Sequence, residues 1–87
     1  MTKKYELCKE HSINLADGTK LYQIRALKDF GNVSKGDFGG YIESEKNLSQ
    51  EGSAWVSDSA QVSGYAWVFE SAQVYGDAQV SGDDQVN

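Results

Sequence analysis

The chain has 87 residues, no proline, one cysteine and a net charge of −5. This length predicts one small domain that buries about two thirds of its unfolded surface. No apolar run approaches the roughly 20 residues of a membrane span, and the N-terminus does not resemble a signal peptide, so we expect a cytoplasmic protein without a membrane partner. The single cysteine, Cys8, excludes an internal disulfide and has no neighbouring metal ligands, and we expect it to be a buried or half-buried strand residue.

The charge is divided unevenly along the chain. All eight basic residues precede residue 47 together with seven acids, which gives 8 − 7 = +1, whereas residues 47–87 hold six acids and no base, which gives −6. Because phosphate binding needs Lys or Arg, we expect no direct contact with nucleic acid in this half. Its charge indicates either a basic partner or a role in solubility alone.

The N-terminal residues predict short antiparallel strands. Alternating apolar and polar residues, with Asp17-Gly18 between two such segments, are typical of an edge strand followed by a hairpin, and the strands expected are 4–9, 12–15 and 20–28. On the last strand the side that carries Tyr22, Ile24 and Ala26 is the more apolar and should face the core. A short helix over 24–29 is the alternative, although it lacks a capping residue.

A glycine-rich segment follows, and we interpret it as a structural transition. Gly36, Gly39 and Gly40 suggest a phosphate-binding loop, but no GK[ST] sequence or following helix supports one. Counting back in sixes from the repeats described next predicts an irregular first coil over 35–52, with large residues in the small-residue sites. Three residues are expected to close the end of the coil, namely Phe38, Ile42 and Leu48.

The last third of the chain repeats every six residues. Valine recurs without a break at 56, 62, 68, 74, 80 and 86, and alanine stands two residues before each of the first five, with Asp84 before the last. In an extended Ala-x-Val triplet the outer residues point one way and the middle residue the other. We therefore predict an interior of alanine and valine, with corners at glycines that accept positive φ. An antiparallel meander of six-residue hairpins is the alternative.

The repeat resembles the hexapeptide repeat of left-handed parallel β-helices, in which an aliphatic residue is followed four positions on by a small one, as in Val56 to Ala60. The resemblance implies an all-β fold: a short left-handed parallel β-helix of about two regular coils and one irregular coil, with an N-terminal antiparallel β-hairpin cap. The expected division is a cap at 1–34 and a β-solenoid at 35–87, within one compact domain. The string from Gly36 to Val56 also resembles a largely uncharacterised family of bacterial and prophage-borne proteins.

The resemblance also implies three six-residue repeats per coil, so residues 18 apart should stack, and this predicts where the outward side chains gather. We expect an exposed ridge of aromatic rings beside the Glu70 corner, which would mark a contact with another molecule. The predicted partner-binding residues are Trp55, Trp67, Phe69, Glu70 and Tyr75. Two regular coils bury little surface, so we expect a dimer or trimer.

These features favour a non-enzymatic, oligomeric protein-binding module with a host protein as partner. Its concrete form would be a phage-encoded, anti-CRISPR-like inhibitor of an antiviral nuclease, acting in the host cytoplasm. One alternative is a small-ligand or nucleotide-binding protein with an aromatic pocket between subunits, and a purely structural capping piece is another. A third is a remnant of a hexapeptide acyltransferase, although His11, the only histidine, lies outside every repeat. We predict no catalytic residue, metal or cofactor.

Overall fold

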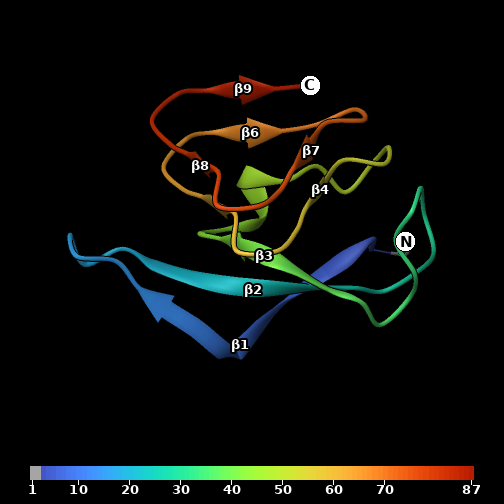
Figure 1. The fold of residues 1–87 in the computed structure, drawn as a ribbon, viewed down its shortest axis with the longest axis horizontal. Helices are drawn as coiled ribbons and strands as arrows, with labels where there is room; N and C mark the ends of the chain where they lie inside the picture. Colours follow the sequence, from blue (N-terminus) through green and yellow to red (C-terminus); the bar gives the residue numbers. More distant parts are fainter. Residues whose placement is uncertain (1–2) are drawn as a thin grey trace.

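The computed structural model describes residues 3–87, and the fold is all-β apart from one turn of 3-10 helix. Three longer strands come first (Figure 1), β1 Tyr5–Asn14, β2 Lys20–Ala26 and β3 Phe38–Ile42, followed by η1 Glu45–Asn47. Six two-residue strands complete the chain: β4 Trp55–Val56, β5 Gln61–Val62, β6 Trp67–Val68, β7 Gln73–Val74, β8 Gln79–Val80 and β9 Gln85–Val86. None of the helical residues within 3–87 forms a segment able to cross a membrane.

The six short strands stack as three parallel pairs, and this confirms the predicted spacing of 18 residues. Trp55 is paired with Gln73, Gln61 with Gln79, and Trp67 with Gln85. The amides of the lower coil donate to carbonyls of the upper coil at regular intervals, for example Ser57 N to Val74 O at 2.8 Å. The antiparallel meander is therefore wrong. Even the last strand, β9, is paired with β6, although Asp84 replaces the alanine two residues before its valine.

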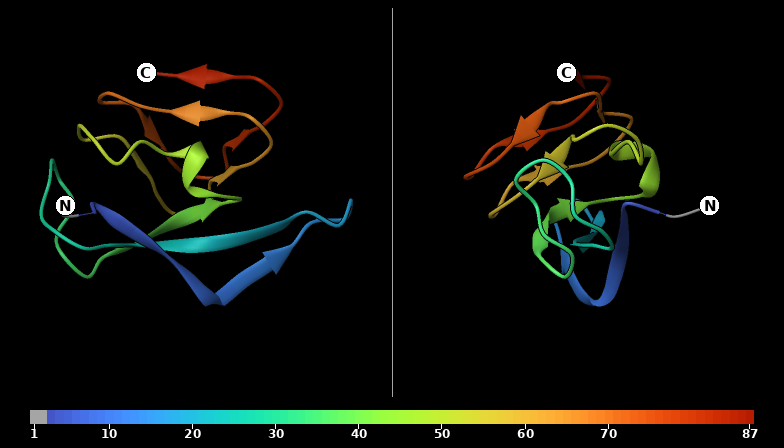
Figure 2. Two further views of the ribbon diagram at one scale, coloured as in Figure 1. Left: turned by 180° about the vertical axis from the view of Figure 1, so that it is seen from behind. Right: turned by 90° about the vertical axis from the view of Figure 1, so that its right-hand side faces the viewer.

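The predicted interior of alanine and valine is confirmed in the lower coil and weakens toward the C-terminal end. Val56, Val62 and Val68 are fully buried, as are the alanines two residues before them. In the upper coil Val74 is still buried, but Val80 and Val86 are only half-buried and Ala78 is exposed. The gradient follows from stacking, because the upper coil has a neighbour on one side only (Figure 2).

Each corner of the coils holds one residue at positive φ, again every six positions. Four of these are glycines, as predicted for tight corners, but Asp58 (φ 57°) and Glu70 (φ 60°) adopt the same conformation with a side chain. Asp58 is compensated by a hydrogen bond, because Gly76 N donates to its Oδ2 at 3.1 Å. No hydrogen bond within residues 3–87 involves the Glu70 side chain.

The irregular first coil exists, but its frame differs from the predicted one. Ile42 pairs with Val62 and Leu48 with Val68, so the offset is 20 residues and both fully buried side chains occupy valine sites rather than alanine sites. Two extra residues between Leu48 and Ala54 account for the shift. Phe38 is 50% exposed and does not close the coil, so that part of the prediction is wrong. Its ring stacks on His11 instead, with centroids 5.4 Å apart.

The N-terminal strands form a sheet that continues into the coils. The order is β1-β2-β3-β5-β8, antiparallel up to β3 and parallel from there on. The two strands expected at 4–9 and 12–15 are one bent strand, because three residues bulge out between Cys8 and Ser12 (Figure 1). The helix considered over 24–29 does not form, since β2 runs to Ala26.

Burial on β2 matches the prediction at Ile24 and Ala26, while Tyr22 is only half-buried. Leu21, assigned to the other side, is fully buried as well. A register shift between Gln23 and Arg25 interrupts the simple alternation of sides.

The glycines of β3 let this strand lie directly against the coil. A Cβ on Gly39 would come within 2.7 Å of Cζ2 of Trp55, and one on Gly40 within 2.6 Å of the Ala60 carbonyl oxygen. Both distances are too short for real atoms, so neither position accepts a larger residue without movement. This close approach accounts for two of the glycines that sequence analysis weighed as a phosphate loop.

Two buried polar side chains connect residues 3–53, which we call the N-terminal block, to the two regular coils of residues 54–87. Asn47 accepts from Ser44 N at 2.9 Å and donates to the carbonyls of Gly64 (3.2 Å) and Ala66 (2.8 Å), so η1 is tied to the corner above it. Lys4 donates from Nζ to the Ala54 carbonyl at 2.7 Å. Its ammonium forms no ion pair among residues 3–87, and burial together with nearby Lys28 lowers the pKa of Lys4 to about 8.

Tyr5 makes a third link from β1. Its hydroxyl donates to the Leu48 carbonyl and lies 3.2 Å from the Glu45 carbonyl oxygen. Burial, with the Glu45 carboxylate nearby, raises the pKa of Tyr5 well above its ordinary value. The hydroxyl therefore stays protonated and able to donate at neutral pH.

Candidate partner-binding surface

Trp55 is buried, and its assignment to an exposed ridge is wrong. It is only 4% exposed because the N-terminal block covers it. Phe30 meets its ring edge to face with centroids 5.2 Å apart, and Tyr5 does so at 6.4 Å. The pairing with Gln73 places Trp55 on the coil as predicted, but the side chain belongs to the core between coil and cap.

Trp67 and Phe69 form a stacked pair on the outside of the coil. Trp67 is the middle residue of its Ala-x-Val triplet, and Phe69 follows the valine, so both project from the strand β6 on the side away from the interior. Their ring centroids are 4.0 Å apart with an interplanar angle of 17°, and Trp67 is 41% exposed. Phe69 is half-buried, so the pair presents one exposed ring supported by a second, and such a surface can anchor another molecule.

A shallow groove of about 410 Å³ runs beside these rings. The corner residues Glu70 and Gly52 and the loop residues Ser49 and Glu51 complete its walls. Glu51 and Glu70 are exposed, and neither carboxylate takes part in an ion pair among residues 3–87. The groove therefore combines an apolar wall with negative charge. We call it the ring groove, defined by Ser49, Glu51, Gly52, Trp67, Phe69 and Glu70.

Tyr75 is exposed but does not extend the ring groove. It follows β7 at the next corner, is 67% exposed, and makes no ring contact with Trp67 or Phe69. The predicted ridge of four aromatic rings is thus reduced to two rings beside Glu70.

Sequence analysis missed Glu51, which enters the site through the two-residue insertion after Leu48. It also passed over Tyr65, which is 86% exposed. The position of Tyr65 directly after the corner glycine Gly64 was a signal that could have found it, because such a residue has no interior to face.

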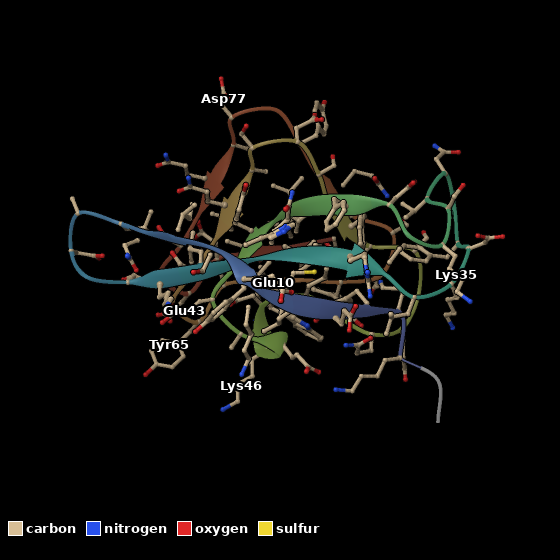
Figure 3. All side chains as sticks on the ribbon, turned by 90° about the horizontal axis from the view of Figure 1, so that it is seen from below. Glu10, Lys35, Glu43, Lys46, Tyr65 and Asp77 are labelled. Atoms are coloured by element: carbon tan, nitrogen blue, oxygen red, sulfur yellow. The ribbon has the colours of Figure 1, made fainter. Side chains whose placement is uncertain are left out.

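A second hollow, of about 820 Å³, lies where the tip of the β1-β2 hairpin meets the coil corners. Its lining is polar and includes Asp17, Glu43, Lys46 and Tyr65, three of which are seen together on one side of the molecule in Figure 3. Glu43 is already engaged, because Gly64 N donates to its Oε1 at 2.7 Å. A backbone hydrogen bond from Thr19 lowers the pKa of Asp17.

The residues with catalytic side-chain chemistry are dispersed. His11 is exposed at the bulge of β1, where its Nδ1 lies 3.1 Å from Oε1 of Gln23. Cys8 is a buried free thiol, as predicted, and burial raises its pKa. Neither residue lines the ring groove or the polar hollow.

Comparison with known proteins gives one informative similarity. No family model matches the chain. It is 39% identical over 67 residues to YdcK of Escherichia coli (strain K12), a protein described as an uncharacterized acetyltransferase. The match takes 70% of this chain and 21% of that protein, so the chain spans about a fifth of the length of this relative.

Together with the six-residue period and the parallel pairing 18 residues apart, this similarity supports a coarse assignment. The chain is hexapeptide-repeat-like.

Proposed function

We propose that the chain is a non-enzymatic, oligomeric protein-binding module whose contact surface is the ring groove. The observation that carries the proposal is the stacked pair of exposed Trp67 and half-buried Phe69 on the outside of the coil. Aromatic anchors on a preorganised surface are the usual centres of protein interfaces. The excess of acidic residues after position 46 favours a basic partner.

The scaffold for this surface is, in our proposal, a left-handed parallel β-helix. The constant offset of 18 residues and a positive-φ residue at every sixth position support it. A crystal structure with right-handed winding would contradict this part of the proposal.

The test is affinity capture from a bacterial lysate with matched variants. Trp67→Leu removes the ring anchor but keeps an apolar residue, whereas Tyr75→Leu alters an exposed ring outside the groove. The proposal expects a partner that is retained by the parent and by Tyr75→Leu, is lost with Trp67→Leu, and is released by salt. Equal capture by Trp67→Leu would contradict it. Light scattering after size exclusion tests the expected dimer or trimer.

The more specific role is that of a phage-encoded inhibitor of a host antiviral nuclease. Nucleases carry basic surfaces where they hold nucleic acid, so an acidic module with an aromatic anchor has a complementary target there. The partner retained in the capture experiment should then be a basic, nucleic-acid-binding protein whose activity falls when the module is added. A partner without nucleic-acid affinity would contradict this role.

The name of the E. coli relative favours a second candidate, an acyltransferase-like protein. It stands against the non-enzymatic assignment, although the similarity covers a minor part of that relative. Calorimetry with acetyl-CoA separates the two, because a module of the proposed kind should give no heat of binding. A nucleotide pocket lined by Trp55, Trp67, Phe69 and Tyr75 loses support, since Trp55 is buried in the core.

A further inference from the structure

The ring groove joins two features that together select a particular ligand chemistry. The faces of aromatic rings attract cations, and carboxylates beside them neutralise a cation and accept its hydrogen bonds. Trp67 and Phe69 supply the rings, and Glu51 and Glu70 supply the carboxylates. The groove thus contains the two kinds of group that bind an organic cation, an aromatic face and a carboxylate.

Neither of these carboxylates forms an ion pair within residues 3–87. The ion pairs found within residues 3–87 join Lys3 to Glu45 and Arg25 to Glu6, and both lie in the N-terminal block. Residues 47–87 contain no Lys or Arg at all. The nearest backbone link, from Lys4 Nζ to the Glu51 carbonyl at 3.4 Å, involves the main chain rather than the carboxylate. Among residues 3–87, both carboxylates are therefore available to pair with a cation of another molecule.

The backbone at Glu70 points to the same conclusion. It occupies a corner where the four equivalent glycines avoid the strain that a side chain incurs at positive φ. Asp58 offsets that strain through its bond with Gly76 N, but Glu70 has no such bond within the described chain. Backbone strain that no hydrogen bond in the fold offsets is typical of functional positions.

We propose that the ring groove binds an arginine side chain of the partner, with the guanidinium flat against Trp67 and paired with the Glu70 carboxylate. This inference rests on the proposed function and specifies its partner. Arginine fits better than lysine because its planar group stacks on a ring and offers two parallel donors to a carboxylate. Glu51 also lines the groove and adds to its negative charge.

The test uses three short peptides of the form acetyl-Gly-X-Gly-amide, in which X is Arg, Lys or citrulline. Binding to the full chain is followed through the two tryptophan indole N–H signals in NMR spectra. The Arg peptide should shift the Trp67 signal at millimolar concentration and leave that of buried Trp55 unchanged. The Lys peptide should bind at least about threefold more weakly, and citrulline, which is planar but uncharged, should not bind.

The decisive variant is Glu70→Gln, which keeps the size of the side chain and should weaken the binding of the Arg peptide by about fivefold. Its matched control is Glu10→Gln, an exposed carboxylate in β1 outside the groove, which should change nothing. Equal shifts with Arg and citrulline, or unchanged binding by Glu70→Gln, would overturn the inference.

The two proposals fail in distinguishable ways. If Trp67→Leu loses the captured partner while Glu70→Gln keeps it and the Arg peptide causes no shift, the arginine inference is wrong and the binding module stands. If Trp67→Leu retains the partner, the proposed function itself is wrong.

Discussion

Residues 3–53 and residues 54–87 are stabilised in different ways. The first region buries large side chains and fixes them with individual polar contacts, among them those of Lys4, Tyr5 and Asn47. Apart from Trp55, which packs against the first region, the second region buries only alanine and valine and depends on a regular ladder of backbone hydrogen bonds. A ladder of identical small units leaves free to vary those outward positions that the first region does not cover. The irregular block must instead be specified residue by residue, and it gives the coil a closed lower end.

The largest expected loss of stability comes from removing the hydrogen-bond donors of the Asn47 side chain. Asn47→Asp leaves the Gly64 and Ala66 carbonyls without donors and places a carboxylate against them. We expect a loss of about 3 kcal/mol in the free energy of unfolding, measured by urea denaturation at pH 7. Asn32→Asp makes the same chemical change at an exposed site and should stay within about 0.5 kcal/mol. Similar losses at both sites would show that Asn47 is not a fastening point.

The gradient along the coils is tested by two equivalent valines in one column. Val62→Ala, at a fully buried site, should lower the free energy of unfolding by about 2 kcal/mol. Val80→Ala, at a half-buried site, should lower it by less than about 1 kcal/mol. Urea midpoints of both variants measure the difference. Equal losses in solution would mean that the upper coil is covered, as it would be in an oligomer joined at that end.

Lys4 makes the stability of the N-terminal block depend on pH. Its pKa is lowered to about 8 in the folded chain and is near 10.5 when unfolded, so between these values the unfolded state binds more protons. The penalty for burying the charge is fully present below pH 8 and is relieved as pH rises toward 10. Relative to Lys4→Met, the parent should gain about 1 kcal/mol from pH 7.5 to 9.5 in urea denaturation. A constant difference would contradict this assignment.

The smallest expected effect concerns the two corners that lack glycine. Glu70→Gly should raise the free energy of unfolding by about 0.5 kcal/mol, because it removes the strain of a side chain at positive φ. Asp58→Gly also removes the bond to Gly76 N and should give no gain. Thermal midpoints of the two variants give the comparison. If Glu70→Gly destabilises the chain, the carboxylate has a structural role that replaces the proposed functional one.

The sequence by itself determined that the last residues form coils. In a six-residue repeat with alternating side-chain direction, every alanine and valine points to the same side and can be buried in one interior. The corner glycines and the interior residues follow from local chemistry that repeats without interruption, whereas the spacing of 18 was implied by the resemblance to hexapeptide-repeat β-helices. The N-terminal block was less predictable. Its bulge after Cys8 and the two extra residues after Leu48 change register, and neither change leaves a periodic signal.

The candidate site was decided by tertiary structure. Trp55 and Trp67 stand in identical Ala-Trp-Val triplets, so no local rule separates them. Phe30, Tyr5 and the bare backbone of Gly39 close over the first, while the second stacks on Phe69 in solvent. The difference arises because the cap covers one side of the coil and leaves another open, and contacts between residues far apart in the chain are what fix that choice.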